Sequence, residues 1–145
     1  MVETQEVEKV IFDLKRIERE IDEIAINALR KNEAKIVELI LSQLKSGTQG
    51  DGKEITPRYT VRTVQIKKAK AQEFRFVTLR DTGDFYKSIT VEYDKTEARI
   101  IATDSKTKKL IAKYGPEILE LSPANLQRLK DHMRPGIERA FLNLL

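Results

Sequence analysis

A Thr-Gly pair lies within the stretch LRDTGDFYKSITVEY, residues 79–93, and glycine turns can bind phosphate. A nucleotide-binding loop needs several glycines at fixed spacing, whereas this stretch has Gly83 alone. We therefore interpret the pair as a structural turn, with a ligand site as the alternative. The Thr82 hydroxyl is expected to cap a short helix by accepting a hydrogen bond from the amide of Asp84 or Phe85. Gly83 would allow a sharp change of direction, and the Asp84 carboxylate suits the positive end of that helix.

Residues that could perform catalysis or hold a metal are few. The chain has no cysteine, which excludes disulfides and thiolate metal sites, and His132 is its single histidine. The carboxylates that we considered as magnesium ligands do not have the spacing of a nuclease or polymerase site: Asp81, Asp84, Asp94 and Asp104. The sequence shows no activated nucleophile and no acid–base pair. We therefore expect a protein that is not an enzyme and that has no catalytic residue, metal or cofactor.

The basic residues are concentrated in the middle of the chain. The net charge is +4, but residues 46–80 carry eight basic against three acidic residues, whereas residues 1–45 carry eight against ten. Aromatic residues lie among these cations, which is a weak indication of nucleic-acid binding. The sequence predicts a surface that faces a partner or DNA through Arg58, Arg62, Lys67, Lys68 and Lys70. A solvated lysine-rich loop is the alternative interpretation, and a nucleic-acid-binding or regulatory protein using residues 58–75 is the alternative function.

The first 45 residues have the periodicity of a long amphipathic helix. Apolar side chains recur at spacings of three and four, at Val7, Val10, Leu14, Ile17, Ile21 and Ile24. A helix of about 40 residues would be about 60 Å long, which exceeds the diameter of a small domain. We expect it either to bend near Asn32 or to pack its first half on another subunit. The narrow stripe favours a partner helix and predicts an oligomer interface, with a helical hairpin inside one subunit as the alternative.

The middle of the chain contains short elements between turn signals. Ser46-Gly47 is expected to end the long helix, and the structure of residues 58–72 stays open. Residues 73–79 are predicted to be extended, with a helical turn following the Thr-Gly pair. The alternation of apolar and polar residues in SITVEYD and EARIIATD predicts an antiparallel hairpin.

The C-terminal part is predicted to be helical. Ser122 is expected to be the N-cap of a helix with Pro123 at its first position, and Pro135 to break or kink that helix. The fold class is therefore α+β, with a long N-terminal helix, a small antiparallel sheet and C-terminal helices. We expect a single domain over residues 1–145, made of the segments 1–45, 46–72, 73–121 and 122–145.

The sequence gives no signal for membrane insertion. The first residues, MVETQEVEKV, are acidic and lack an apolar run of signal-peptide length. No stretch approaches the ~20 apolar residues that a bilayer-spanning helix needs. We expect a protein that is located, or assembled, in the cytosol.

The stretch VTLRDTGDFYKSITVEY resembles a motif of tailed-phage virion proteins, the tail-completion, neck or virion-morphogenesis proteins. In that family a Thr-Gly pair set among apolar residues and a serine precedes a β-hairpin, and an aromatic-glycine pair follows downstream. The upstream helix, the basic stretch and the segment ATDSKTKKLIAKYG look similar to versions from Bacteroides-type phages or prophages. The matching positions are Leu79, Thr82, Gly83, Phe85, Ser88, Ile89, Tyr114 and Gly115. Asp84 belongs to the structural motif of the turn, but at Asp84-Phe85-Tyr86 the chain departs from the residues that the family usually carries.

This resemblance implies a structural virion protein without catalytic activity. Such proteins form a ring, often of six or twelve copies, in the head-to-tail connector between portal and tail. The implied partners are further copies of the chain and portal, neck or tail proteins, together with non-specific contact to packaged DNA. The implied location is the neck or tail of the virion, after assembly in the host cytoplasm. The basic segment would then face either the DNA channel or an acidic partner ring.

Overall fold

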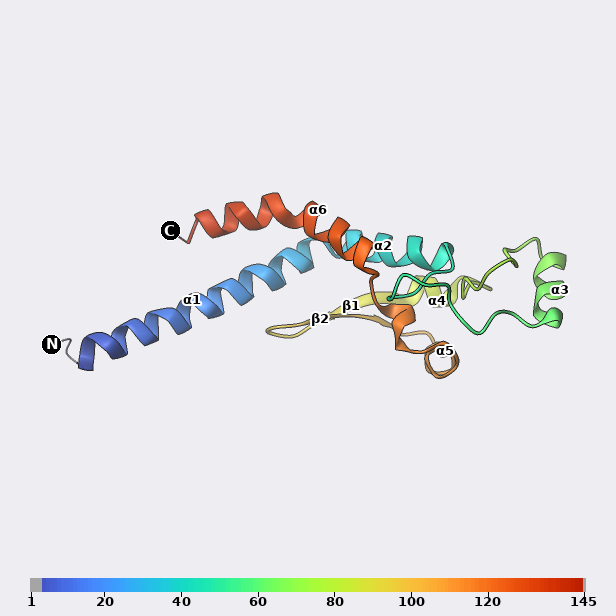
Figure 1. Ribbon diagram of the computed structural model, residues 1–145, viewed down its shortest axis with the longest axis horizontal. Coiled ribbons are helices and arrows are strands. Elements are labelled where there is room, and N and C mark those ends of the chain that lie inside the picture. Colours follow the sequence, from blue (N-terminus) through green and yellow to red (C-terminus); the bar gives the residue numbers. More distant parts are fainter. Residues whose placement is uncertain (1–3, 145) are drawn as a thin grey trace.

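The computed structural model describes the backbone of residues 4–144 and the side chains of residues 15–144. The predicted α+β class, with a long N-terminal helix, a small antiparallel sheet and helical C-terminal part, is confirmed (Figure 1). The elements follow the order α1 (Thr4–Lys31), α2 (Glu33–Lys45), α3 (Val61–Ala69), α4 (Asp84–Ser88), β1 (Ile89–Tyr93), β2 (Ala98–Ala102), α5 (Thr107–Tyr114), the 3₁₀ turn η1 (Pro116–Leu119) and α6 (Pro123–Leu142).

The predicted bend of the N-terminal helix is confirmed at Asn32. This residue has φ −109° and ψ 20°, and its side-chain amide donates to the carbonyl of Ala28 at 2.7 Å. α1 and α2 follow each other along the long axis of the molecule instead of folding back (Figure 1), so the alternative of a helical hairpin is wrong. α1 packs instead on α6 from the other end of the chain.

The end of α2 follows the predicted glycine signal. Gly47 has φ +72°, its amide donates to Leu44, and the amide of Thr48 donates to Gln43 at 3.1 Å. This pair of bonds is a Schellman motif, which satisfies carbonyls at the end of a helix. A side chain at residue 47 would also collide with the ring of Phe76, since a Cβ would lie 2.5 Å from its Cδ2.

The predicted hairpin is confirmed as the antiparallel pair β1 and β2. Ile89 lies opposite Ala102 and Val91 opposite Ile100, and both β1 residues are buried. Val91 packs against Ile36 of α2, so one face of the sheet is covered by that helix. The connection is closed by the Asp94 carboxylate, which accepts from the amides of residues 96 and 97 and whose pKa these bonds lower.

Residues 73–79 form no strand, so the prediction of an extended strand there is wrong. Val77, Thr78 and Leu79 are all buried, which an alternating strand cannot achieve. Leu79 has φ +58°, which is incompatible with a strand. Two tyrosines provide the bonds that a neighbouring strand would otherwise make: Tyr59 Oη accepts from the amide of Thr78 at 3.1 Å, and Tyr86 Oη donates to its carbonyl at 2.5 Å.

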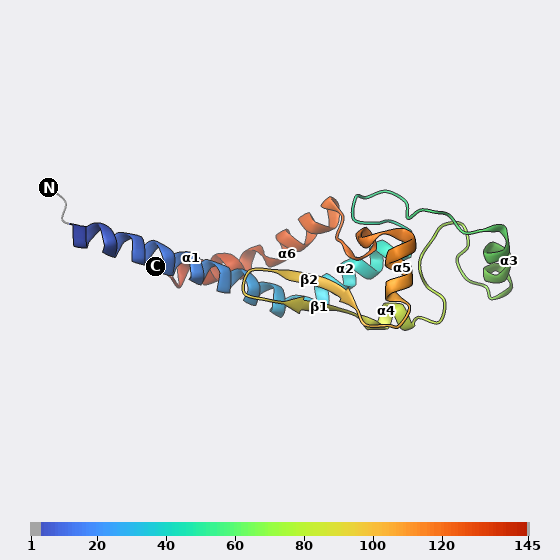
Figure 2. The ribbon, with the colours of Figure 1, turned by 90° about the horizontal axis from the view of Figure 1, so that it is seen from below.

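The segment that the sequence left open contains a helix. Thr60 is the N-cap of α3, and its hydroxyl accepts from the amide of Thr63 at 3.2 Å. The segment 46–72 is therefore not a loop throughout. α3 lies at one end of the long axis, beyond the hairpin and α5, and both views show this (Figures 1 and 2).

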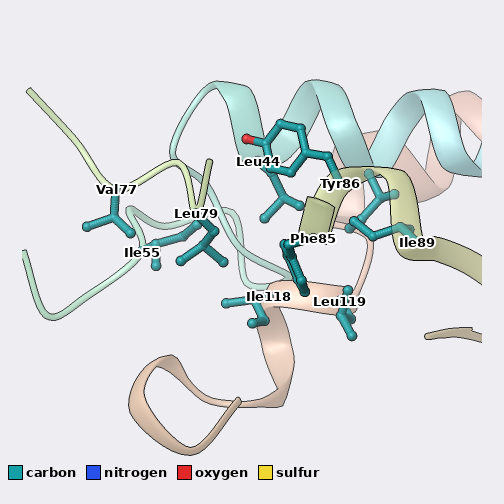
Figure 3. Close-up of a cluster of buried hydrophobic side chains, with 10 residues drawn as sticks. Leu44, Ile55, Val77, Leu79, Phe85, Tyr86, Ile89, Ile118 and Leu119 are labelled. Atoms are coloured by element: carbon teal, nitrogen blue, oxygen red, sulfur yellow. The ribbon is translucent and has the colours of Figure 1, made fainter. Parts of the chain in front are cut away.

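The main hydrophobic core lies between α2, the Thr-Gly turn and η1. Its fully buried side chains include Ile40, Leu44, Ile55, Val77 and Ile118. Figure 3 shows Phe85 pointing from the short helix α4 into this group, toward η1. The motif that carries the family resemblance is thus built into the centre of the fold.

The start of α6 is as predicted, but its expected break is not observed. The Ser122 hydroxyl accepts from the amide of Asn125 at 3.3 Å, with Pro123 in the first turn. The helix continues through Pro135 to Leu142, so the expectation of a break there is wrong. The alternative expectation, a kink, agrees with the change of direction that α6 shows midway (Figure 1). Both Pro135 and Asp131, whose carbonyl loses its partner, are exposed, and water can therefore replace the missing bond.

A buried amide joins α2 to the start of α6. Gln43 is 3% exposed, and its Nε2 donates to the carbonyl of Glu120 at 2.8 Å. Its Oε1 accepts from the amide of Ser122 at 2.8 Å and from Asn125 Nδ2 at 3.1 Å. The Glu120 carbonyl and the Ser122 amide therefore take their hydrogen bonds from the Gln43 side chain. Removing that side chain would be costly, because buried polar groups without a partner destabilise the folded state.

Replacing Gln43→Leu should therefore destabilise the protein by about 2 to 4 kcal/mol, because the Ser122 amide and the Glu120 carbonyl lose their partner. Urea unfolding followed by circular dichroism measures this difference. The matched control is Gln127→Leu, whose side chain is exposed and bonds only to Asp131. Equal stability of the two variants would contradict a central role for Gln43.

Candidate functional site

The Thr-Gly turn has the hydrogen bond that the sequence predicts. Thr82 Oγ1 accepts from the amide of Asp84 at 3.3 Å, and Gly83 has φ +91°. The N-cap residue of α4 is Gly83, so the prediction that Thr82 is the N-cap is wrong by one position. The Thr82 hydroxyl still bonds the first amide of the helix from the position before the N-cap. Phe85 and Ile89 are buried in the same core, as expected from their spacing of four. The turn therefore directs the chain from the irregular segment into α4 and the hairpin.

The polar groups beside the turn are bonded to one another. Asp81 Oδ1 accepts from Lys70 Nζ at 3.1 Å, and this bond lowers the pKa of Asp81 below its ordinary value. Gln72 Nε2 donates to the Asp81 carbonyl at 3.0 Å. A cavity of about 280 Å³ lies between this turn, α3 and α5, and it has Tyr114 in its wall. The adjacent Gly115 has φ +92° and ends α5.

Lys67 does not face outward, so its prediction as a partner- or DNA-facing residue is wrong. Its side chain is buried, at 7% exposure. Nζ donates to the carbonyl of Arg80 at 2.8 Å and lies 4.8 Å from the centre of the Tyr59 ring. The carbonyl and the ring face together compensate the buried charge. Lys67 therefore fastens α3 to the Thr-Gly turn.

A second contact fixes this region to the core. Burial raises the pKa of Tyr86 to about 12, so its phenol keeps the proton that it donates to Thr78. Tyr59, on the chain entering α3, holds the amide of the same residue. Thr78 thus joins the segment before α3, through Tyr59, to the core residue Tyr86.

The other predicted basic residues differ in what they contact. Arg58 pairs with Glu54 at 3.1 Å, and Lys70 with Asp81. Lys68 is exposed, with Nζ 4.8 Å from the centre of the Phe74 ring. Arg62 is exposed and forms no ion pair among the described side chains. We call residues 58–75 the basic end; Arg62 and Lys68 are its outward cations.

Sequence reasoning missed two apolar residues on the surface of the basic end. Val61 is 76% exposed and Ile66 is 45% exposed, both on α3. Because the structure of residues 58–72 stayed open in the sequence, the exposure of these two side chains could not be predicted. Arg62 lies one helical turn before Ile66, so a cation and an apolar side chain share one face of the helix.

The predicted oligomer interface lies at the opposite end of the molecule. α1 extends past the C-terminal end of α6 (Figures 1 and 2). Ile17 is 41% and Ile21 is 38% exposed, while Ile24 is half-buried. The side chains of the other predicted members, Val7, Val10 and Leu14, lie outside the described residues. We call residues 4–24, the first part of α1, the helical end.

The residues considered for metal or acid–base chemistry are not brought together. His132 is exposed on α6, and Asp104 accepts from the amide of Lys106 in its own turn. Among the described residues no group of three or more His, Asp or Glu side chains has a metal-binding arrangement. Within the same part of the chain, no helix has the length and apolar character that crossing a membrane requires.

Comparison with known proteins finds no family model that matches the chain, and no match among curated proteins or solved structures. The geometry of the motif and of the two ends therefore carries the functional argument.

Gly83→Ala should destabilise the protein by about 1 to 2 kcal/mol, because φ +91° disfavours any side chain. No other atom lies within 4 Å of the added Cβ, so the cost comes from the backbone alone. The matched control is Gly136→Ala inside α6, which should stabilise by about 0.5 to 1 kcal/mol. Thermal unfolding compares the two; a neutral effect at Gly83 would contradict this account of the motif.

Proposed function

We propose that the protein is a structural virion protein of a tailed bacteriophage, which forms a ring in the head-to-tail connector, at the neck or in tail completion. Its activity is assembly with further copies and with portal, neck or tail proteins, and it catalyses no reaction. The observation that carries this proposal is the projecting helix α1, whose apolar stripe leaves Ile17 and Ile21 exposed.

The stripe is suited to an interface between subunits. Single exposed apolar residues are common, but Ile17 and Ile21 are four residues apart and lie on one face of a helix. Burying one such side chain contributes roughly 1.5 to 3 kcal/mol, which must offset the entropy lost on association. A helix that projects from its own core has this surface available for a neighbour.

The motif residues support a structural role. The groups that might have bound a ligand are engaged within the chain: Lys67 with Arg80, Lys70 with Asp81, and Thr82 with Asp84. The Thr-Gly turn builds the core that positions the hairpin and α3. This agrees with the structural role that the resemblance to virion proteins implies.

The test is the mass of the full chain in solution. Light scattering should find six or twelve times the 16.7 kDa subunit mass, alone or after addition of the portal protein, and electron microscopy should show closed rings. Ile17→Lys combined with Ile21→Lys should abolish assembly, because two charges would enter an apolar contact.

Leu126→Lys is the matched control, since Leu126 is exposed to a similar degree but lies on α6 away from the helical end. This variant should assemble like the wild type. A strict monomer, unchanged by the portal or other neck proteins, would refute the proposed function.

A further inference from the structure

We infer that the subunits contact one another head to tail: the helical end of one copy docks on α3 at the basic end of the next copy. This inference rests on the proposed ring and names the partner surface of the α1 stripe. The partner surface is the exposed part of α3, where Arg62 and Ile66 share one face and Val61 lies at the start of the helix.

The first observation is where the exposed apolar side chains lie. Most of the large exposed apolar residues of the described part gather at two separate places. One place is the end formed by α1 and the last turns of α6, with Ile17, Ile21, Phe141, Leu142 and Leu144. The other is α3, with Val61 and Ile66, at the far end of the long axis (Figure 1).

The second observation is that the two ends carry opposite charge. Residues 4–24 of α1 contain seven acidic against four basic residues, whereas residues 58–75 contain six basic against one acidic residue. Two copies placed helical end to helical end would bring like charges together, and so would two basic ends. Only the mixed contact joins opposite charges while burying apolar residues on both sides.

The third observation concerns symmetry. A contact between two different surfaces is heterologous; it gives a ring when the repeated rotation closes and an open filament when it does not. A contact between two identical surfaces gives a two-fold dimer and stops there. The proposed ring therefore needs two unlike surfaces on each subunit, and the molecule presents such surfaces at its opposite ends (Figure 2).

The basic end is held in place before any partner binds. Lys67 fastens α3 to Arg80, and Tyr59 ties the chain that enters α3 to Thr78. A docking surface that is already ordered loses less conformational freedom on association. Arg62 and Lys68 take no part in these contacts and are exposed, so they are available for acidic residues of the neighbour, such as Glu18 and Glu23 on α1.

Packaged DNA is the competing occupant of the basic end. Lys67 and Lys70 are engaged within the chain, which leaves Arg62 and Lys68 as the outward cations for phosphates. The exposed Val61 and Ile66 would gain nothing from a phosphate backbone, but they would gain from an apolar stripe. A second copy of the chain therefore fits this surface better.

The test uses two variants of the full chain that each lack one surface. The first carries Ile17→Lys and Ile21→Lys, and the second carries Val61→Lys and Ile66→Lys. Each variant alone should be monomeric by light scattering. Mixed in equal amounts, they retain one intact contact between them, so the mixture should form a one-to-one dimer and nothing larger. Leu126→Lys should assemble like the wild type.

A charge exchange provides a second measurement that is independent of the apolar substitutions. Glu18→Lys with Glu23→Lys should weaken assembly, and so should Arg62→Glu with Lys68→Glu. All four changes in one chain should restore the wild-type mass, and raised salt should weaken the wild-type contact. Circular dichroism confirms that each variant is folded.

The outcomes separate this inference from the proposed function. If the wild type forms rings while the α3 variant assembles equally well, or if the mixed variants stay monomeric, the inference is overturned and the ring stands. If Arg62→Glu with Lys68→Glu abolishes salt-dependent binding to duplex DNA but leaves the assembly mass unchanged, DNA is the occupant and the inference is likewise overturned. If the wild type is monomeric with and without the portal, the proposed function fails as well.

Discussion

The buried amide of Gln43 holds together parts of the chain that lie almost 80 residues apart in sequence. It fixes the segment that leaves η1 against α2 and sets the point where α6 begins. Because α6 starts there, it runs back along α2 and the last turns of α1. The N-terminal part of α1 extends past the end of α6 (Figure 1), and Ile17 and Ile21 are exposed and available to a neighbour.

At the basic end, the amide and carbonyl of Thr78 hold together segments that are distant in sequence. Tyr59 and Tyr86 bond to its amide and carbonyl, and the buried Lys67 adds a third link through Arg80. These contacts attach α3 firmly to the rest of the protein. The molecule therefore has a helical end and a basic end, and α3 of the basic end is fixed to the core. This arrangement suits a component whose function is to connect subunits.

Local signals predicted much of this fold. The hairpin, the bend at Asn32 and the cap at Ser122 depend on neighbours a few residues away, and the sequence contains those neighbours. The burial of Lys67 and the irregular backbone at Thr78 depend on residues distant in sequence, so composition and periodicity could not reveal them. For the same reason the sequence located the cluster of basic residues, while the burial of Lys67 and the exposure of Val61 and Ile66 on α3 were missed.

The head-to-tail contact can be tested most directly by cross-linking, because the chain contains no cysteine of its own. Ile17→Cys and Arg62→Cys, placed together in one chain, lie at opposite ends of a single subunit and can meet only between copies (Figure 1). Mild oxidation should then produce a ladder of covalent oligomers that ends at the mass of the closed ring, while Ile17→Cys alone produces none. Covalent dimers from Ile17→Cys alone, with no larger species from the double variant, would contradict the account.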